Sequence, residues 1–214
     1  MAETLLAPIV LAAASIPALV ASDWHGWRPG RYLFKPLSAV AFLWMALAAG
    51  ATDSAYGIWL LAGLIASAVG DLSLMIERNA AFLTGLTAFL VGHLLYALAF
   101  MGITSDLSYM LAGGIPALVL AVGAARWLRP HLEPSMRTPV LAYIAVIAVM
   151  LACAGGTAGD TIAWFVVLGA WGFAVSDLAV ARQQFVVKAK TNPLWGTPLY
   201  FGSQLLLAAS PLAL

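Results

Sequence analysis

The feature that most constrains this chain is a series of eight apolar stretches, each about as long as a lipid bilayer is thick. A membrane-spanning helix needs about 20 predominantly apolar residues. Because the connections between the stretches are short, the sequence predicts an all-α bundle of eight transmembrane helices that forms a single domain over residues 1–214. Cutting the sequence at charges and at Gly, Pro and Asp clusters places the spans at 3–22, 34–51, 56–76, 80–102, 107–128, 138–156, 160–181 and 196–213.

The composition supports a membrane protein. Hydrophobic residues make up 63% of the chain and charged residues 9%, against about 45–50% and 25% in soluble proteins. A net charge of +1 and the lack of a basic patch with interleaved aromatic residues argue against nucleic acid as a partner. The single cysteine, Cys153, excludes an internal disulfide. The first apolar run lacks a basic segment before it, so we interpret it as a retained span rather than a signal peptide.

The basic residues indicate the orientation. They all lie in or beside the first, third, fifth and seventh connections between spans, and basic residues mark the cytoplasmic face of a membrane protein. The sequence therefore predicts that both termini lie on the non-cytoplasmic side, and we expect the membrane to be a bacterial inner (plasma) membrane. The ten residues are Arg28, Arg31, Lys35, Arg78, Arg126, Arg129, Arg137, Arg182, Lys188 and Lys190.

Residues 35–75 resemble residues 138–181. Each segment begins with a proline beside a predicted cytoplasmic helix start, turns at a Gly/Thr/Asp cluster and ends in a span with a small residue followed by Asp-Leu. This pattern predicts two four-helix halves of the same orientation, related by an axis near the membrane normal. The alternative is that apolar helices resemble one another through composition alone.

Two acidic residues lie inside predicted spans. Asp71 precedes Glu77 by six residues, about 9 Å along a helix, and Asp177 precedes Arg182 by five. Ionisable groups inside a membrane are costly and usually mark a function. We expect the two carboxylates to face each other across the bundle axis. The alternative for each is a structural carboxylate capped by a Ser, Tyr or Lys of a neighbouring helix.

Other polar residues cluster toward the two aspartates. His93 and Tyr96 are three residues apart on one face of the fourth span, and Tyr200 and Gln204 are four apart on one face of the last. A core histidine and an aromatic anchor at the membrane interface are the structural alternatives for His93 and Tyr200. The set is completed by Lys35, Tyr143 and Ser176.

The distribution of these residues bears on the class of protein. His25 and His131 lie in connections and cannot converge with His93 without a re-entrant loop, so we expect no three-histidine metal site. The polar residues crowd the predicted cytoplasmic half, which favours a site closed at one end over a conduit lined along its length. A small transporter or channel for a lipid or small solute is the alternative, and a purely structural membrane protein is a third possibility.

Four segments resemble a known family. They read "GDLSLM … FLTGLTAFLVGHLLYALAF" over 70–100, "PVLAY" over 139–143, "SDL" over 176–178 and "YFGSQ" over 200–204. Through them the chain resembles the YhhN-type lysoplasmalogenase family from residue 35 to residue 204. The resemblance implies an eight-span membrane enzyme whose substrate is a lysophospholipid. Such an enzyme hydrolyses the vinyl-ether bond of a lysoplasmalogen to a fatty aldehyde and a glycerophospho-ethanolamine or glycerophospho-choline.

That reaction needs a general acid, a base for water and negative charge near a cation, a demand similar to the one that glycosidases meet with two carboxylates. We therefore expect it to require no metal or organic cofactor. We expect Asp71 to be the general acid and Asp177 to stabilise the cation and activate water, although the two roles can be exchanged. We expect His93, with Tyr96, to orient water or relay protons. The residues expected to bind the polar part of the substrate are Lys35 for the phosphate and Tyr143, Ser176, Tyr200 and Gln204 for the glycerol and ether oxygens.

Overall fold

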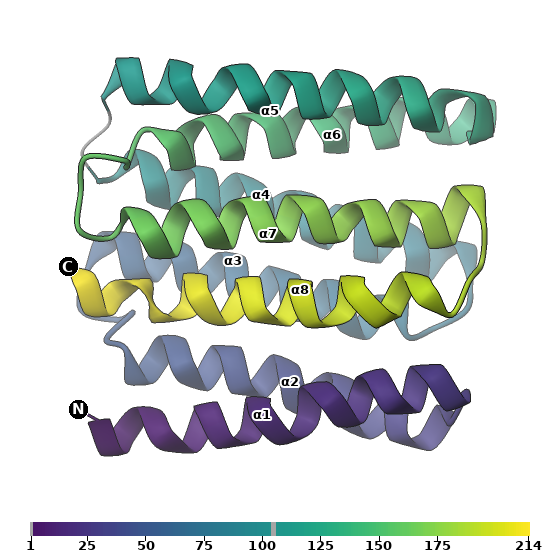
Figure 1. The fold of residues 1–214 in the computed structure, drawn as a ribbon, viewed down its shortest axis with the longest axis horizontal. Helices are drawn as coiled ribbons and strands as arrows, with labels where there is room; N and C mark the ends of the chain where they lie inside the picture. Colours follow the sequence, from purple (N-terminus) through teal and green to yellow (C-terminus); the bar gives the residue numbers. More distant parts are fainter. Residues whose placement is uncertain (1, 104–105) are drawn as a thin grey trace.

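The computed structural model describes residues 2–103 and 106–214, with side chains from Thr4 onward, and this part of the chain is a bundle of antiparallel helices without a strand (Figure 1). Each predicted span corresponds to one long helix. The helices are α1 (Ala2–His25), α2 (Arg28–Ala48), α3 (Ala55–Leu74), α4 (Asn79–Met101), α5 (Leu107–Leu128), α6 (Pro134–Gly155), α7 (Ala163–Ala181) and α8 (Thr191–Ala209).

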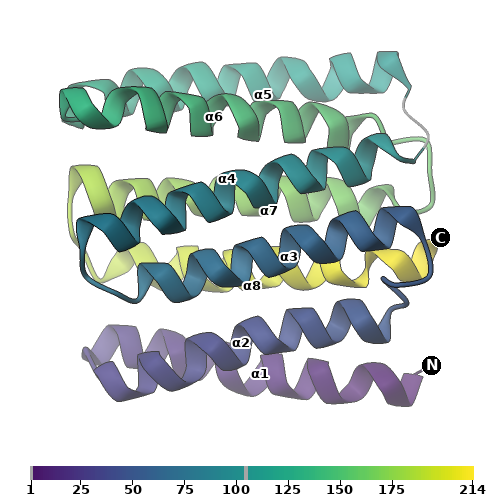
Figure 2. The same ribbon diagram turned by 180° about the vertical axis from the view of Figure 1, so that it is seen from behind.

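The helices pack in pairs that are neighbours in sequence. The closest pairs are α1 with α2, α3 with α4, α5 with α6, and α7 with α8. Figures 1 and 2 show the first pair at one edge of the bundle, the α5–α6 pair at the other, and the remaining four helices between them. Both chain ends lie at the same end of the bundle (Figure 1). The connections α1–α2, α3–α4, α5–α6 and α7–α8 lie at the opposite end.

Glycines allow the helices within two of these pairs to approach closely. A Cβ atom at Gly63 of α3 would lie 2.5 Å from the ring of Tyr96 in α4, and one at Gly70 would lie 2.7 Å from the ring of Phe89. In α7, a Cβ at Gly169 would lie 2.7 Å from Leu207 of α8. Small residues at membrane helix interfaces permit this kind of contact. The two helices that carry the aspartates are therefore each pressed against a partner helix.

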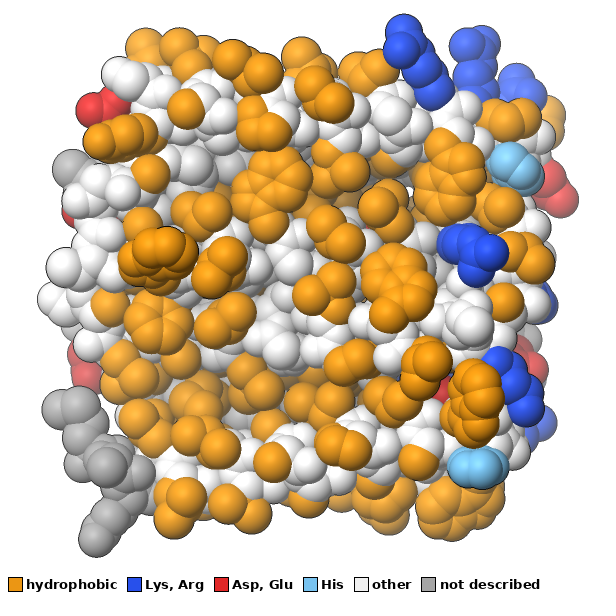
Figure 3. Space-filling model, viewed as in Figure 1, with side chains coloured by type: hydrophobic (Ala, Val, Ile, Leu, Met, Phe, Trp, Pro, Cys, Tyr) orange, Lys and Arg blue, Asp and Glu red, His pale blue; other side chains and the backbone are white. Residues whose placement is uncertain are grey.

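The outer surface is that of an integral membrane protein. Six helical segments of the described chain are long and apolar enough to cross a membrane: Thr4–His25, Ala55–Leu74, Asn79–Met101, Leu107–His131, Pro134–Gly155 and Ala163–Val186. Apolar side chains on α5, such as Ile115 and Val119, are more than 60% exposed. Figure 3 shows apolar side chains over the middle of one face and Lys and Arg side chains gathered at one end. Apolar exposure on this scale fits lipid, not water.

Helix α2 begins six residues earlier than predicted. The stretch from Arg28 was interpreted as a connection because of its charges, but Pro29 fits the first turn of a helix, where its missing N–H has no partner to lose. Gly26, with a φ of 69°, makes the tight turn from α1. As a consequence, Arg31 and Lys35 lie four residues apart on one helix and share a face.

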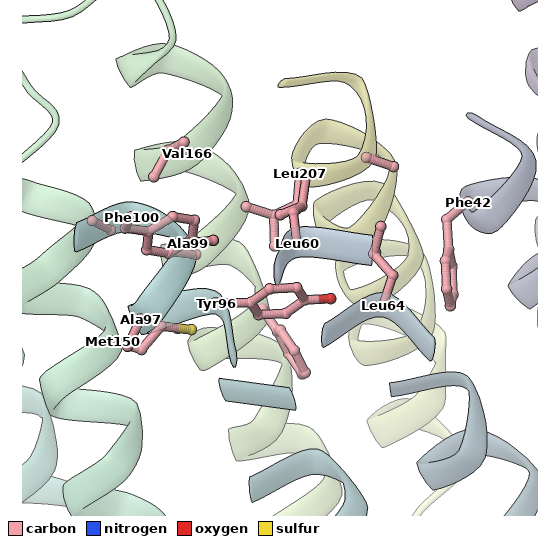
Figure 4. Close-up of a cluster of buried hydrophobic side chains, with 14 of the residues drawn as sticks. Phe42, Leu60, Leu64, Tyr96, Ala97, Ala99, Phe100, Met150, Val166 and Leu207 are labelled. Carbon is pink, nitrogen blue, oxygen red and sulfur yellow. The ribbon is translucent and has the colours of Figure 1, made fainter. Parts of the chain in front are cut away.

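A buried apolar cluster fills the bundle toward the end where the chain begins and ends. Leu60, Phe100, Met150 and Leu207 are at most 1% exposed and come from four different helices. Figure 4 shows the ring of Tyr96 among these side chains. The bundle is therefore densely packed on this side of the aspartates.

Candidate active site

A cavity of about 550 Å³ lies at the basic end of the bundle. One part of its wall is polar and comes from α1, α2, α3 and α8, with Lys35, Asp71 and Tyr200 among its residues. The other part is largely apolar and comes from α4, α5 and α6, with residues such as Leu86, Leu120 and Ile147. Asp177 of α7 lines the same cavity. The cavity is thus divided into a polar side and an apolar side, with both aspartates on its wall.

Asp71 is held by a cation and a hydroxyl. The residue is 2% exposed, and its Oδ1 lies 3.2 Å from the Nζ of Lys35. The phenol of Tyr200 donates a hydrogen bond of 2.7 Å to Oδ2. Both neighbours stabilise an ionised carboxylate, because one brings positive charge and the other donates a proton to an oxygen.

Asp177 has different neighbours. The phenol of Tyr143 donates a hydrogen bond of 2.8 Å to its Oδ2. The Nε2 atom of His93 lies 3.6 Å from the same oxygen. Within the described residues, no Lys or Arg side chain forms an ion pair with this carboxyl group. Asp177 therefore has a hydroxyl and an imidazole as its partners, and no permanent cation.

The imidazole of His93 has a defined tautomer when it is neutral. Its Nδ1 lies 2.6 Å from the carbonyl oxygen of Phe89, and a carbonyl can only accept, so Nδ1 carries the hydrogen. Nε2 is then an acceptor, and among the described residues it has no hydrogen-bond partner. The ring is completely buried and packs on Phe173, with ring centroids 4.3 Å apart. The acceptor Nε2 of His93 therefore faces Oδ2 of Asp177. A proton on one of these two atoms would remove the repulsion between them.

A chain of hydrogen bonds leads away from Asp71 into the core. Tyr96 donates to the Oε1 of Gln204 at 2.7 Å, and the Nε2 of Gln204 donates to the phenol oxygen of Tyr200 at 3.2 Å. Tyr200 in turn donates to Asp71. In this series each group accepts a hydrogen bond from the group before it and donates to the next. The series therefore orients the phenol hydrogen of Tyr200 toward the carboxylate of Asp71. Tyr96 and Gln204 are completely buried.

Not every predicted residue reaches the cavity. Lys35, Asp71, Tyr143, Asp177 and Tyr200 line it. His93, Tyr96 and Gln204 lie behind this wall and contact it through Asp177 or Tyr200.

Ser176 is placed differently from the prediction. Its hydroxyl donates to the carbonyl of Phe173 in the same helix at 2.7 Å, and the residue is 1% exposed and does not line the cavity. A serine inside a helix often bonds a carbonyl one turn back, and this bond turns the hydroxyl of Ser176 away from the substrate space. The part that we expected it to play in binding glycerol or ether oxygens has no support in this geometry.

The sequence interpretation missed two charged residues on the polar side. Asp23 of α1 and Arg31 of α2 line the cavity, with Arg31 Nε 3.8 Å from Asp23 Oδ1. The spacing of Arg31 and Lys35 could have indicated a shared face if the helix start had been placed correctly. Asp23 had no such signal, because it follows the predicted end of the first span.

The connection between α7 and α8 lines the entrance of the cavity. Asn192 holds it in place: its Nδ2 donates to Gln183 Oε1 at 2.6 Å and to the Val187 carbonyl at 2.8 Å. Lys188 and Lys190 of this connection also line the cavity. The entrance is therefore positively charged. No group of three or more His, Cys, Asp or Glu side chains that could hold a metal ion occurs among the described residues.

The fold and site define a helical integral membrane protein with one buried and one largely buried carboxyl group, Asp71 and Asp177, on one amphipathic cavity. The family model described as "YhhN family" matches residues 30–211. The chain therefore belongs to the YhhN family.

Curated relatives are similar over most of their length. The chain is 35% identical to lysoplasmalogenase TMEM86B of Rattus norvegicus over 211 residues, which cover 97% of this chain and 83% of the relative. It is 32% identical to lysoplasmalogenase TMEM86B of Homo sapiens over 213 residues, 97% of this chain and 86% of the relative. It is 30% identical to lysoplasmalogenase TMEM86A of Bos taurus over 158 residues, 69% of this chain and 62% of the relative. No solved structure matches the chain significantly.

Proposed function

We propose that this protein is a lysoplasmalogenase that hydrolyses the vinyl-ether bond of 1-alkenyl-glycerophosphoethanolamine or 1-alkenyl-glycerophosphocholine. The products are a fatty aldehyde and the glycerophospho-alcohol. The observation that carries the proposal is the divided cavity, in which a charged wall meets an apolar wall and which both Asp71 and Asp177 line. A lysolipid has the same division, and its ether bond lies at the junction. The names of the curated relatives point to the same activity.

The chemistry explains why two carboxyl groups are useful. A vinyl ether resists nucleophiles but accepts a proton on the alkenyl carbon farther from oxygen. Protonation leaves an oxocarbenium ion, which water attacks to give a hemiacetal. The catalyst therefore needs one carboxyl group that holds a proton and another that stays charged, as in glycosidases.

The surroundings of the two aspartates favour Asp177 as the acid and Asp71 as the charged partner. Lys35 at 3.2 Å stabilises the ionised form of Asp71. Asp177 faces the acceptor Nε2 of His93, so a proton on Asp177 removes the repulsion between two acceptors. When Asp177 and His93 are both neutral, the protein also avoids the cost of burying a second ion pair beside the one between Lys35 and Asp71. This assignment exchanges the roles that the sequence first suggested.

The proton balance closes over one turnover. Asp177 gives its proton to the alkenyl carbon, and the carboxylate of Asp71 stabilises the resulting cation. Water attacks the cationic carbon and gives a proton to Asp71. When the hemiacetal collapses, its hydroxyl proton returns to Asp177 and the proton on Asp71 moves to the departing glycerol oxygen. Tyr200 and Tyr143 keep the two carboxyl groups in position.

All eight helices are proposed to cross the membrane. α2 and α8 have 21 and 19 residues and lie alongside the six apolar helices (Figures 1 and 2). The basic end of the bundle is placed in the cytoplasm, and both termini outside it, on the basis of the Lys and Arg distribution. A bacterial inner membrane remains our prediction. In this orientation the substrate enters from the cytoplasmic leaflet.

The depth of the cavity favours an enzyme over a transporter or channel. The lining residues reach about halfway along α5 and α8, to Ala117 and Phe201, and about two thirds of the way along α6, to Ala148. Beyond them the apolar cluster around Leu60 and Phe100 fills the bundle. A conduit needs a polar path through the whole membrane.

Aldehyde release by the purified protein tests the proposal. The protein in detergent is offered 1-alkenyl-glycerophosphoethanolamine, and the aldehyde is coupled to NADH oxidation by an alcohol dehydrogenase. We expect release from this lipid and none from the matching 1-acyl lysolipid, because an ester gives a fatty acid. A folded sample that releases no aldehyde from the alkenyl lipid would contradict the proposed function.

A further inference from the structure

Four charged side chains form a row along the polar wall of the cavity. Arg31 of α2 lies 3.8 Å from Asp23 of α1, and Lys35 of α2 lies 3.2 Å from Asp71 of α3. All four residues line the cavity. Arg31 and Lys35 are one helical turn apart, a rise of about 6 Å. Followed from contact to contact, from Asp23 to Arg31, Lys35 and Asp71, the row therefore reads acid, base, base, acid.

The packing of α1 on α2 fixes this row. A buried hydrogen bond of 2.9 Å joins the hydroxyls of Ser38 and Ser15, and it sets the register of the two helices. Asp23 lies two turns beyond Ser15 along α1, and Arg31 lies two turns before Ser38 along α2. Because the helices are antiparallel, this register places Asp23 opposite Arg31.

Asp23 and Arg31 take no part in the proposed reaction, and their mutual contact is loose. A charge-assisted hydrogen bond is about 2.7–2.9 Å long, whereas the Arg31 to Asp23 distance is 3.8 Å. The other polar contact of the guanidinium group, to the carbonyl of Leu74, is 3.5 Å. The Asp23 side chain is 19% exposed and that of Arg31 is 35% exposed. Both groups can therefore turn toward a bound molecule without breaking a strong bond.

We propose that this row is the head-group site for an aminoalkyl phosphodiester, with Arg31 binding the phosphate and Asp23 binding the ammonium group. The inference rests on the proposed function. The groups of such a lysolipid follow the same order as the row: ammonium, phosphate, glycerol and ether bond. Arg31 presents a planar fork that suits a phosphate, and Lys35 adds positive charge on the inner side. Asp71 then meets the carbon that becomes cationic.

The arrangement gives Asp23 a role in selecting the substrate. A head group with an ammonium compensates the charge of Asp23 when it displaces Arg31. A lysolipid that ends in a phosphate monoester brings only negative charge, so it meets Asp23 without compensation. The site therefore prefers zwitterionic head groups to anionic ones.

Binding of uncleavable lipids tests the head-group site independently of the reaction. The probes are 1-alkyl-glycerophosphoethanolamine and 1-alkyl-glycerophosphate, whose saturated ether is not hydrolysed. We expect the wild-type protein to bind the ethanolamine lipid about tenfold or more tightly, and we expect Asp23→Asn to reduce this ratio toward one. Asp23→Glu keeps the charge and is expected to keep the preference. Asp53→Asn, at an exposed turn on the opposite end, is the matched control.

The ratio of two affinities on one preparation does not depend on the fraction of folded protein. An Asp23→Asn variant with the wild-type ratio would overturn the head-group site, and so would a wild-type protein without preference. Aldehyde release by the same preparations reports separately on the proposed function. Release by the wild-type protein combined with an unchanged binding ratio in Asp23→Asn would leave the activity standing and remove the head-group site.

Discussion

Asp71 and Asp177 lie on the third and seventh helices, and each has one neighbour on the preceding helix and one on a helix from the other half of the chain. Lys35, the neighbour of Asp71, belongs to α2, the helix before α3. Tyr143, the neighbour of Asp177, belongs to α6, the helix before α7. Tyr200 belongs to the last helix of the second half, and it contacts the aspartate of the first half. His93 belongs to α4 in the first half of the chain, and it lies beside Asp177, the aspartate of the second half.

The frame is shared, but the chemistry of the neighbours differs. Asp71 receives an ammonium group, and Asp177 receives a neutral phenol from the corresponding helix. One carboxyl group is therefore prepared to carry charge and the other to carry a proton. In the proposed reaction, one cation in α2 is therefore enough to give the two aspartates different roles.

Replacement of either aspartate is expected to have the largest effect on activity. In the proposed reaction Asp71 and Asp177 act directly on the substrate, so we expect Asp71→Asn and Asp177→Asn each to lower aldehyde release by about 10²–10⁴-fold. The measurement is the rate with 1-alkenyl-glycerophosphoethanolamine at equal amounts of folded protein. If either variant keeps near-normal rates, that aspartate is not part of the reaction.

The same two variants should differ in stability. Asp71→Asn leaves the largely buried Lys35 without its counter-ion, which we expect to cost on the order of 1–3 kcal/mol after allowance for partial exposure. If Asp177 is protonated as proposed, Asp177→Asn replaces a neutral acid by a neutral amide and should change stability little. Thermal unfolding in detergent measures the difference. A second change, Lys35→Met in the Asp71→Asn background, should restore stability but not activity. Equal melting temperatures for the two single variants would count against different charge states.

The two phenols give a smaller and finer comparison. Tyr200→Phe removes a hydrogen bond to a charged carboxylate, which is worth about 1.5–3 kcal/mol, so we expect a loss of roughly 10–100-fold in kcat/KM. Tyr143→Phe removes a hydrogen bond to a protonated carboxyl group, worth about 0.5–1.5 kcal/mol, so we expect roughly 2–10-fold. Initial rates for both variants provide the test. A larger loss in Tyr143→Phe would reverse the proposed assignment.

The helices could be predicted from the sequence because apolar length and the positions of basic residues are local signals. All eight long helices occur where the apolar stretches lie, although α2 begins earlier than its charges suggested. The two aspartates could also be selected, since a carboxyl group within an apolar span is unusual. Six membrane-length apolar helices are present, and the crossing of all eight, like the repeat, stays a prediction.

The partners of the aspartates could not be predicted in the same way. Tyr200 and Asp71 are 129 residues apart, and no local pattern links them. Ser176 adjoins Asp177 in sequence, yet its hydroxyl bonds the backbone of its own helix. The place of Asp23 in the cavity depends on the register of α1 on α2, which brings it opposite Arg31 and which the sequence does not show. Neighbourhood in sequence misled for Ser176, and Asp23 was missed because it follows the predicted end of the first span.

The most direct test of the division between the two aspartates is the infrared spectrum of the protein near neutral pH. The carbonyl stretch of a protonated carboxyl group is separate from the bands of a carboxylate, so difference spectra between wild type and each Asp→Asn variant show which aspartate carries the proton. We predict that the protonated band is lost in Asp177→Asn and retained in Asp71→Asn. Loss of the band in Asp71→Asn, with retention in Asp177→Asn, would contradict the account.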